Sequence, residues 1–136
     1  MSIDAAAIQR LYLLFGALVV SVIALLYGVS PSWFVRTFFG LEALDPNLAH
    51  ILRAIMGLYL AFALFWVFAA FRDDYRKIAV LTTVVFAGGL VSGRLLSLPM
   101  DGAPARLLLL YVAMEFAFVP IGIWIFRLPT RGTGGA

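Results

Sequence analysis

Residues 78–98, with the sequence IAVLTTVVFAGGLVSGRLLSL, decide the fold class of this chain. A helix of about 20 residues, at a rise of about 1.5 Å per residue, crosses a hydrocarbon core about 30 Å thick. Arg94 is the one charged residue within this stretch. Its length and apolar content predict a membrane-spanning helix.

Three further apolar segments of similar length, residues 8–29, 48–71 and 106–127, make up most of the remaining sequence. The chain has 136 residues, is 64% hydrophobic and only 12% charged, and has a mean hydropathy of +1.05. A soluble domain would be about half apolar and about a quarter charged. The strands of a membrane barrel would be about half as long and would alternate in polarity. We therefore predict an all-α integral membrane four-helix bundle with up-down-up-down topology.

This bundle is expected to be a single domain over residues 1–129, followed by a disordered tail over residues 130–136. The first apolar segment is too long for a signal peptide and lacks a small-residue cleavage pattern, so it is expected to remain as a helix. Trp33, Trp66 and Trp124 are expected at membrane interfaces, which amphipathic aromatic side chains favour.

Composition also excludes several kinds of chemistry. The sequence has no cysteine, which removes disulfides, thiolate metal sites and c-type haem attachment. It shows no glycine-rich phosphate loop, no metal-ligand spacing and no nucleophile elbow, and its single histidine cannot supply paired haem ligands. We expect no metal and no cofactor, and an enzyme is the weakest interpretation. The net charge of +3 reflects basic residues that flank the spans, so nucleic acid is not expected as a partner.

Basic residues predict the orientation in the membrane. If the chain crosses four times, one side carries Arg10, Arg72, Arg76, Lys77, Arg127 and Arg131, and the other carries Arg36 and Arg106. Lysine and arginine are enriched in cytoplasmic loops, so both termini are expected to be cytoplasmic. Residues 72–77 then form a tight cytoplasmic hairpin.

The connection over residues 30–47 is expected to contain a short helix in the headgroup region. Ser30 and Pro31 resemble a helix cap and first helical residue, and Gly40 is expected to end the helix. Asp45 and Pro46 are expected to start the second span in the same way. Residues 98–104 are expected to form a turn.

Arg94 and Glu115 are ionisable residues in the third and fourth spans. A charge at this depth costs about 2.5–3.5 kcal/mol on insertion scales, so it is usually paired. Side chains lean toward the N-terminus of their helix, which directs Arg94 to the membrane centre and Glu115 toward the outer side. We expect the two to pair. The pair is either a structural link between helices or part of a site, and the sequence leaves both open.

Small and polar residues share one face of each of the last three spans, and these faces are expected to point inward and to converge in the outer half of the bundle. They comprise His50, Arg53 and Gly57 in the second span, Gly89, Gly93, Arg94 and Ser97 in the third, and Tyr111, Glu115 and Gly122 in the fourth. The candidate ligand-binding residues are His50, Arg53, Arg94, Ser97, Tyr111 and Glu115. His50 is most simply an interfacial residue, with proton transfer or ligand contact as the alternative. Gly89 and Gly93 are consistent with helix packing inside the chain or between copies.

Four short motifs resemble those of DUF4345, a family of small four-span bacterial membrane proteins. They are Arg53-Ala-Ile-Met-Gly57, Gly93-Arg94-Leu-Leu-Ser97, Asp101-Gly-Ala-Pro104 and Glu115. The resemblance covers nearly all of the chain, and the layout is also similar to that of DoxX-like four-helix proteins. It implies a multi-pass protein of the bacterial inner membrane and implies no activity.

The leading hypothesis is that the bundle binds a small apolar or amphipathic ligand (a lipid, quinone or isoprenoid) in an outward-facing polar cleft. An alternative is a structural or accessory subunit of a larger membrane complex. A further alternative is a small proton-coupled transporter, in which Glu115 carries the proton and Gly89 and Gly93 form a homodimer contact. The uneven distribution of basic residues counts against that class, because antiparallel dimers need a nearly balanced one.

Overall fold

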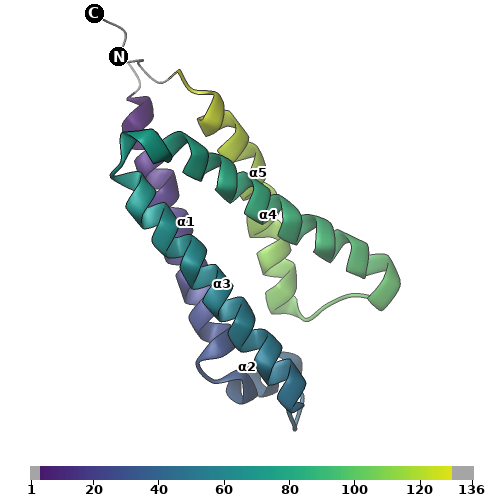
Figure 1. Cartoon of the computed structure of the whole chain (residues 1–136). Coiled ribbons are helices and arrows are strands. Elements are labelled where there is room, and N and C mark those ends of the chain that lie inside the picture. The colour runs from purple at the N-terminus through teal and green to yellow at the C-terminus, as the bar shows by residue number, and fades with distance from the viewer. Residues whose placement is uncertain (1–3, 130–136) are drawn as a thin grey trace, which may run out of the picture.

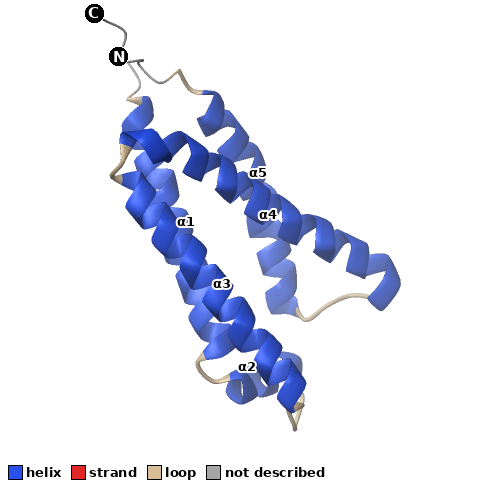
Figure 2. Ribbon diagram, in the orientation of Figure 1, coloured by secondary structure: helices blue, strands red, loops and turns tan. Residues whose placement is uncertain are grey.

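The computed structural model describes residues 4–129, which form five helices and, within that range, no strand (Figures 1 and 2). Four long helices are accompanied by one short helix: α1 (Ala5–Gly28), α2 (Pro31–Phe39), α3 (Pro46–Ala70), α4 (Asp73–Asp101) and α5 (Arg106–Arg127). The four long helices are long and apolar enough to cross a membrane. The predicted all-α fold is confirmed, and the chain is a multi-pass membrane protein. The expected tail over residues 130–136 lies outside the described residues.

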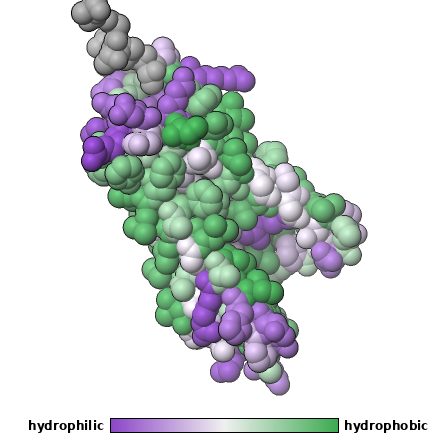
Figure 3. All heavy atoms as spheres, viewed as in Figure 1, coloured by the Kyte–Doolittle hydropathy of each residue, from purple (hydrophilic) through white to green (hydrophobic). Residues whose placement is uncertain are grey.

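The helices associate in two pairs, α1 with α3 and α4 with α5. The pairs lie together at the end that holds the α3–α4 turn, which we call the terminal end. They diverge toward the opposite end, which holds α2 and the α4–α5 turn and which we call the α2 end (Figure 1). Hydrophobic residues cover the middle of the face seen in Figure 3, and hydrophilic residues gather at the ends. This distribution fits a bundle whose middle is covered by lipid.

The core at the terminal end is built around Trp66. This side chain is 1% exposed, and its indole Nε1 donates to Thr82 Oγ1 at 3.0 Å. The Thr82 hydroxyl in turn donates to the Ala79 carbonyl at 2.7 Å. Trp66 therefore faces the interior of the bundle, and its expected position at a membrane interface stays a prediction. A buried indole needs a partner for its N–H, and α4 supplies one.

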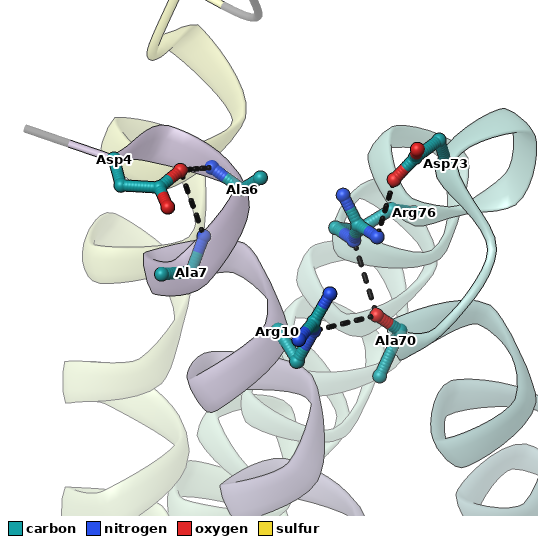
Figure 4. Close-up of polar contacts among 7 residues, drawn as sticks. All are labelled: Asp4, Ala6, Ala7, Arg10, Ala70, Asp73 and Arg76. Carbon is teal, nitrogen blue, oxygen red and sulfur yellow. Dashed lines mark hydrogen bonds and ion pairs between the residues drawn. The ribbon is translucent and has the colours of Figure 1, made fainter.

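Two arginines donate hydrogen bonds to the C-terminal end of α3 (Figure 4). Arg10 of α1 and Arg76 of α4 each donate from Nε to the Ala70 carbonyl, at 3.3 and 3.1 Å. Arg76 is 5% exposed and also forms an ion pair with Asp73. The last carbonyls of a helix have no partner within it, so cationic donors there stabilise the helix end. This contact joins three helices at the terminal end.

The predicted helix ends are mostly confirmed. The Asp45 side chain accepts from the Asn47 amide at 2.7 Å at the start of α3, and Gly40 ends α2 with a φ of 69°. Helix α2 begins at Pro31 with Ser30 as its N-cap residue, as predicted, but the Ser30 side chain makes no capping hydrogen bond.

The turn predicted over residues 98–104 starts later in the structure, after residue 101. Helix α4 continues past Pro99 to Asp101, and Gly102 with a φ of 88° ends it. Proline removes only one donor, and the Gly102 amide still bonds the Leu98 carbonyl, so the final turn stays helical.

The inward face predicted for the second span is wrong. Arg53 and Gly57 are exposed on α3, whereas Leu52, Tyr59 and Trp66 are buried. At about 100° per residue, Arg53 lies about a quarter turn from Leu52. Large aromatic side chains fill the space between α3 and its neighbours, so small and polar residues are left outside. An exposed arginine on a span can extend its charged group to the interface at little cost.

Candidate functional site

Arg94 and Glu115 form the ion pair that the sequence predicts. Arg94 Nε donates to Glu115 Oε2 at 3.0 Å. The two side chains are 21% and 13% exposed, so the pair is largely shielded. The Arg94 guanidinium also lies over the Tyr111 ring, 5.8 Å from its centroid, and beside the Tyr27 hydroxyl. Two aromatic side chains thus confine the charged group that joins α4 to α5.

A cleft between α4 and α5 lies on the arginine side of this pair, and we call it the α4–α5 cleft. Its volume is about 430 Å³. It is lined by Gly89, Leu90, Gly93, Arg94, Ser97, Leu98, Asp101, Gly102, Ala103, Pro104, Leu108 and Val112. Most of these residues are apolar or lack a large side chain, and the polar ones lie on α4. The cleft therefore combines a few polar groups with an apolar wall.

A second cavity, which we call the aromatic cavity, lies on the glutamate side. Its volume is about 60 Å³. Its aromatic lining comprises Phe15, Tyr59, Trp66, Phe86, Tyr111 and Phe118. Glu115 and Thr83 also line it, and Leu90 lines both cavities. The ion pair thus lies between the two spaces.

Their volumes distinguish what the two cavities can hold. A cavity of about 150 Å³ is known to hold benzene. The aromatic cavity is smaller than this, so it fits water or a narrow piece of chain. The α4–α5 cleft is within the range of about 300–1,000 Å³ that is typical of ligand sites. It is the stronger candidate for a binding site.

Tyr111 has a buried hydroxyl without a hydrogen-bond partner within residues 4–129. The residue is 4% exposed and faces the aromatic cavity. A buried hydroxyl normally has a partner, because leaving it unpaired costs about 1–3 kcal/mol. The cavity is large enough for a water molecule that would satisfy it.

Sequence reasoning missed two tyrosines near the pair. Tyr27 is 6% exposed and its ring centroid lies 6.2 Å from that of Tyr111. Tyr59 is equally buried and lies 6.2 Å from Tyr27. Their positions depend on the α1–α3 packing, for which the sequence pattern gave no signal.

The candidate residues divide into two groups in the structure. Arg94 and Ser97 line the α4–α5 cleft, and Tyr111 and Glu115 line the aromatic cavity. His50 and Arg53 line neither space and are exposed on α3. Their assignment as ligand contacts stays a prediction.

Gly89 and Gly93 do not pack against another helix of the described chain. A Cβ atom built on either would meet nothing within 4 Å. By contrast, a Cβ atom on Gly122 would overlap the Tyr12 hydroxyl and Val84. Gly122 therefore permits a close approach between helices, whereas Gly89 and Gly93 leave space in the cleft.

The family model described as a domain of unknown function (DUF4345) matches residues 8–126, which is most of the chain. The chain belongs to the DUF4345 family. No curated protein and no solved structure matches it. In this DUF4345 chain, residues of two motifs quoted above, Gly93–Ser97 and Asp101–Pro104, line the α4–α5 cleft, and Glu115 pairs with Arg94.

Proposed function

We propose that this DUF4345 protein binds a small amphipathic molecule, such as a lipid, quinone or isoprenoid, in the α4–α5 cleft. The observation that carries the proposal is the position of Arg94, which lines a cleft of about 430 Å³ while its Nε is held by Glu115. Ligand sites typically combine apolar walls with a few fixed polar groups. The cleft has this composition.

Each polar residue has a role in this proposal. Glu115 fixes the Arg94 guanidinium through its Nε, and the N–H donors that do not face Tyr27 can meet a polar head. Ser97 lies one turn further along α4 and adds a hydroxyl to the same cleft. The leucines and glycines of the wall contact the apolar part of the ligand.

The proposal also includes a location and an orientation. The unequal distribution of basic residues supports an orientation with the terminal end in the cytoplasm and the α2 end outside. Under this orientation, in a bacterial inner membrane, the cleft belongs to the outer half of the bundle. A ligand would reach it from the outer leaflet.

Native mass spectrometry of the protein, gently extracted in its own lipids, tests the proposal. The wild type is expected to retain a small molecule, and Arg94→Ala is expected to lose it. Arg36→Ala, which removes an exposed charge on α2, is the matched control and is expected to retain the molecule. Arg94→Ala also breaks the ion pair, so Ser97→Ala serves as a milder second variant. It is expected to retain less of the small molecule than the wild type does. An empty wild-type chain would overturn the proposal and favour a structural subunit.

Two observations weaken the alternative functions. Phe34 and Val35 of α2 are fully buried against the bundle, so this helix offers less aromatic surface to a partner subunit than its sequence suggests. Glu115 Oε2, which would have to carry a proton in a transporter, is bound by Arg94.

A further inference from the structure

We propose that the ligand of the α4–α5 cleft is a zwitterionic phospholipid with a primary ammonium group, the chemistry of phosphatidylethanolamine. This inference rests on the proposed function and names the ligand class of the same site. It is carried by Asp101, the second charged residue that lines the cleft beside Arg94. Neither the ion pair nor the predicted site includes this residue.

The charges of the cleft favour a zwitterion over an anion. Arg94 is neutralised by Glu115, and the carboxylate of Asp101 makes no ion pair within residues 4–129. The nearby Arg106 is exposed and does not line the cleft. The three charged groups therefore sum to one negative charge. A second anion would be repelled, whereas a phosphate joined to an ammonium group can satisfy both Arg94 and Asp101.

The order of these groups along α4 fits such a headgroup. Arg94, Ser97 and Asp101 lie at positions i, i+3 and i+7, so they share one face of α4. All three line the same cleft, with Asp101 nearer the helix end than Arg94. A headgroup whose ammonium group lies outside its phosphate would meet the carboxylate first and the guanidinium deeper in the cleft.

The apolar wall of the cleft can contact the acyl chain of such a lipid. Ser97 and Asp101 lie toward the α4–α5 turn, and Gly89 and Gly93 lie deeper along α4. A Cβ atom added to either glycine would have no neighbour within 4 Å, and Leu90 and Val112 continue the apolar lining. A head near the helix end with a chain running toward the middle of the bundle is the orientation of a lipid in a bilayer.

Competitive lipid binding tests this inference. The delipidated protein in detergent is offered an equimolar mixture of phosphatidylethanolamine, phosphatidylcholine and phosphatidylglycerol with identical acyl chains, and retained lipids are identified by native mass spectrometry. Phosphatidylethanolamine is expected to be favoured about fivefold over each competitor, the ratio for a charge interaction of about 1 kcal/mol. Phosphatidylcholine has the same net charge but no ammonium N–H, so it isolates the hydrogen bond to Asp101.

Variants connect the preference to one side chain. Asp101→Asn is expected to abolish the preference over phosphatidylcholine and to raise the share of phosphatidylglycerol, because the site loses its net negative charge. Asp101→Glu is expected to keep the preference. Glu42→Gln removes an exposed carboxylate outside the cleft and is the matched control.

The outcomes separate the two proposals. Retention of all three lipids in equal amounts, or a preference for phosphatidylglycerol in the wild type, overturns this inference and leaves the proposed function standing. Retention of no lipid overturns both. Soluble glycerophosphoethanolamine is offered in a parallel experiment, and binding as tight as that of the lipid would contradict the role of the apolar wall.

Discussion

At the scale of single residues, two tyrosines are buried to a similar extent but differ in the hydrogen bonds of their hydroxyl groups. Tyr12 and Tyr111 are 6% and 4% exposed. The Tyr12 hydroxyl donates to the Phe118 carbonyl and accepts from Thr83 Oγ1, both at 3.1 Å. The Tyr111 hydroxyl has no partner in the described part of the chain. One hydroxyl connects three helices, and the other is free to meet a water molecule in the aromatic cavity.

Removing each hydroxyl is therefore expected to have a different effect. Tyr12→Phe loses two hydrogen bonds that join helices, so it should lower the free energy of unfolding by about 1–3 kcal/mol. Tyr111→Phe loses no hydrogen bond to the described chain, so it should change the free energy of unfolding by less than about 0.5 kcal/mol. Unfolding in mixed detergent micelles measures both. Equal destabilisation by the two variants would contradict this difference.

The Arg94–Glu115 pair allows a second prediction at this scale. Arg94→Met or Glu115→Gln alone leaves one shielded group without its partner, and each should lower the free energy of unfolding by about 2–4 kcal/mol. The double variant should lose less than the sum of the two, with a coupling energy of about 1–3 kcal/mol. A double-mutant cycle measures the coupling. Strict additivity would mean that the pair contributes nothing to folding.

At the scale of helices, the sequence predicted lengths and ends better than faces. The caps at Asp45 and Gly40 depend on local backbone chemistry, so they could be predicted. The contact between Arg94 and Glu115 could be predicted because consecutive antiparallel spans are neighbours. The inward face of α3 could not, because packing of Tyr59 and Trp66 against other helices decides it.

The glycines give a prediction at the same scale. A methyl group on Gly122 would overlap Tyr12 and Val84, so Gly122→Ala should separate the helices and lower the free energy of unfolding by about 1–3 kcal/mol. Gly57→Ala, on the exposed face of α3, meets nothing within 4 Å and should be neutral or slightly stabilising. Thermal unfolding of both variants in the same detergent is the measurement. Equal melting temperatures would show that the close approach at Gly122 is not required.

At the scale of the whole molecule, the sequence predicted four spans but not how they pair. Apolar length is a property of each segment, whereas the divergence of the two helix pairs results from tertiary packing. The aromatic cavity lies where these pairs meet, and the α4–α5 cleft lies within one pair. This explains why Arg94, Ser97 and Glu115 could be placed near each other, while Tyr27 and Tyr59 could not.

The proposed orientation is testable because the natural sequence has no cysteine. Glu42→Cys places a thiol in the α2–α3 connection, and Asp74→Cys places one in the first turn of α4. A membrane-impermeant maleimide applied to intact cells should label the first and spare the second. Both should react after the membrane is permeabilised. Labelling of Asp74→Cys alone in intact cells would reverse the orientation.

The most direct test of the central claim, that the α4–α5 cleft holds an amphipathic molecule, is to fill the cleft without changing its charges. Gly93→Leu places a side chain in the cleft, and Gly57→Leu places the same side chain on the exposed face of α3. Molecules that co-purify with each variant are quantified by native mass spectrometry. We predict that Gly93→Leu folds but loses the bound molecule, whereas Gly57→Leu retains it. Equal retention by two folded variants would contradict the claim.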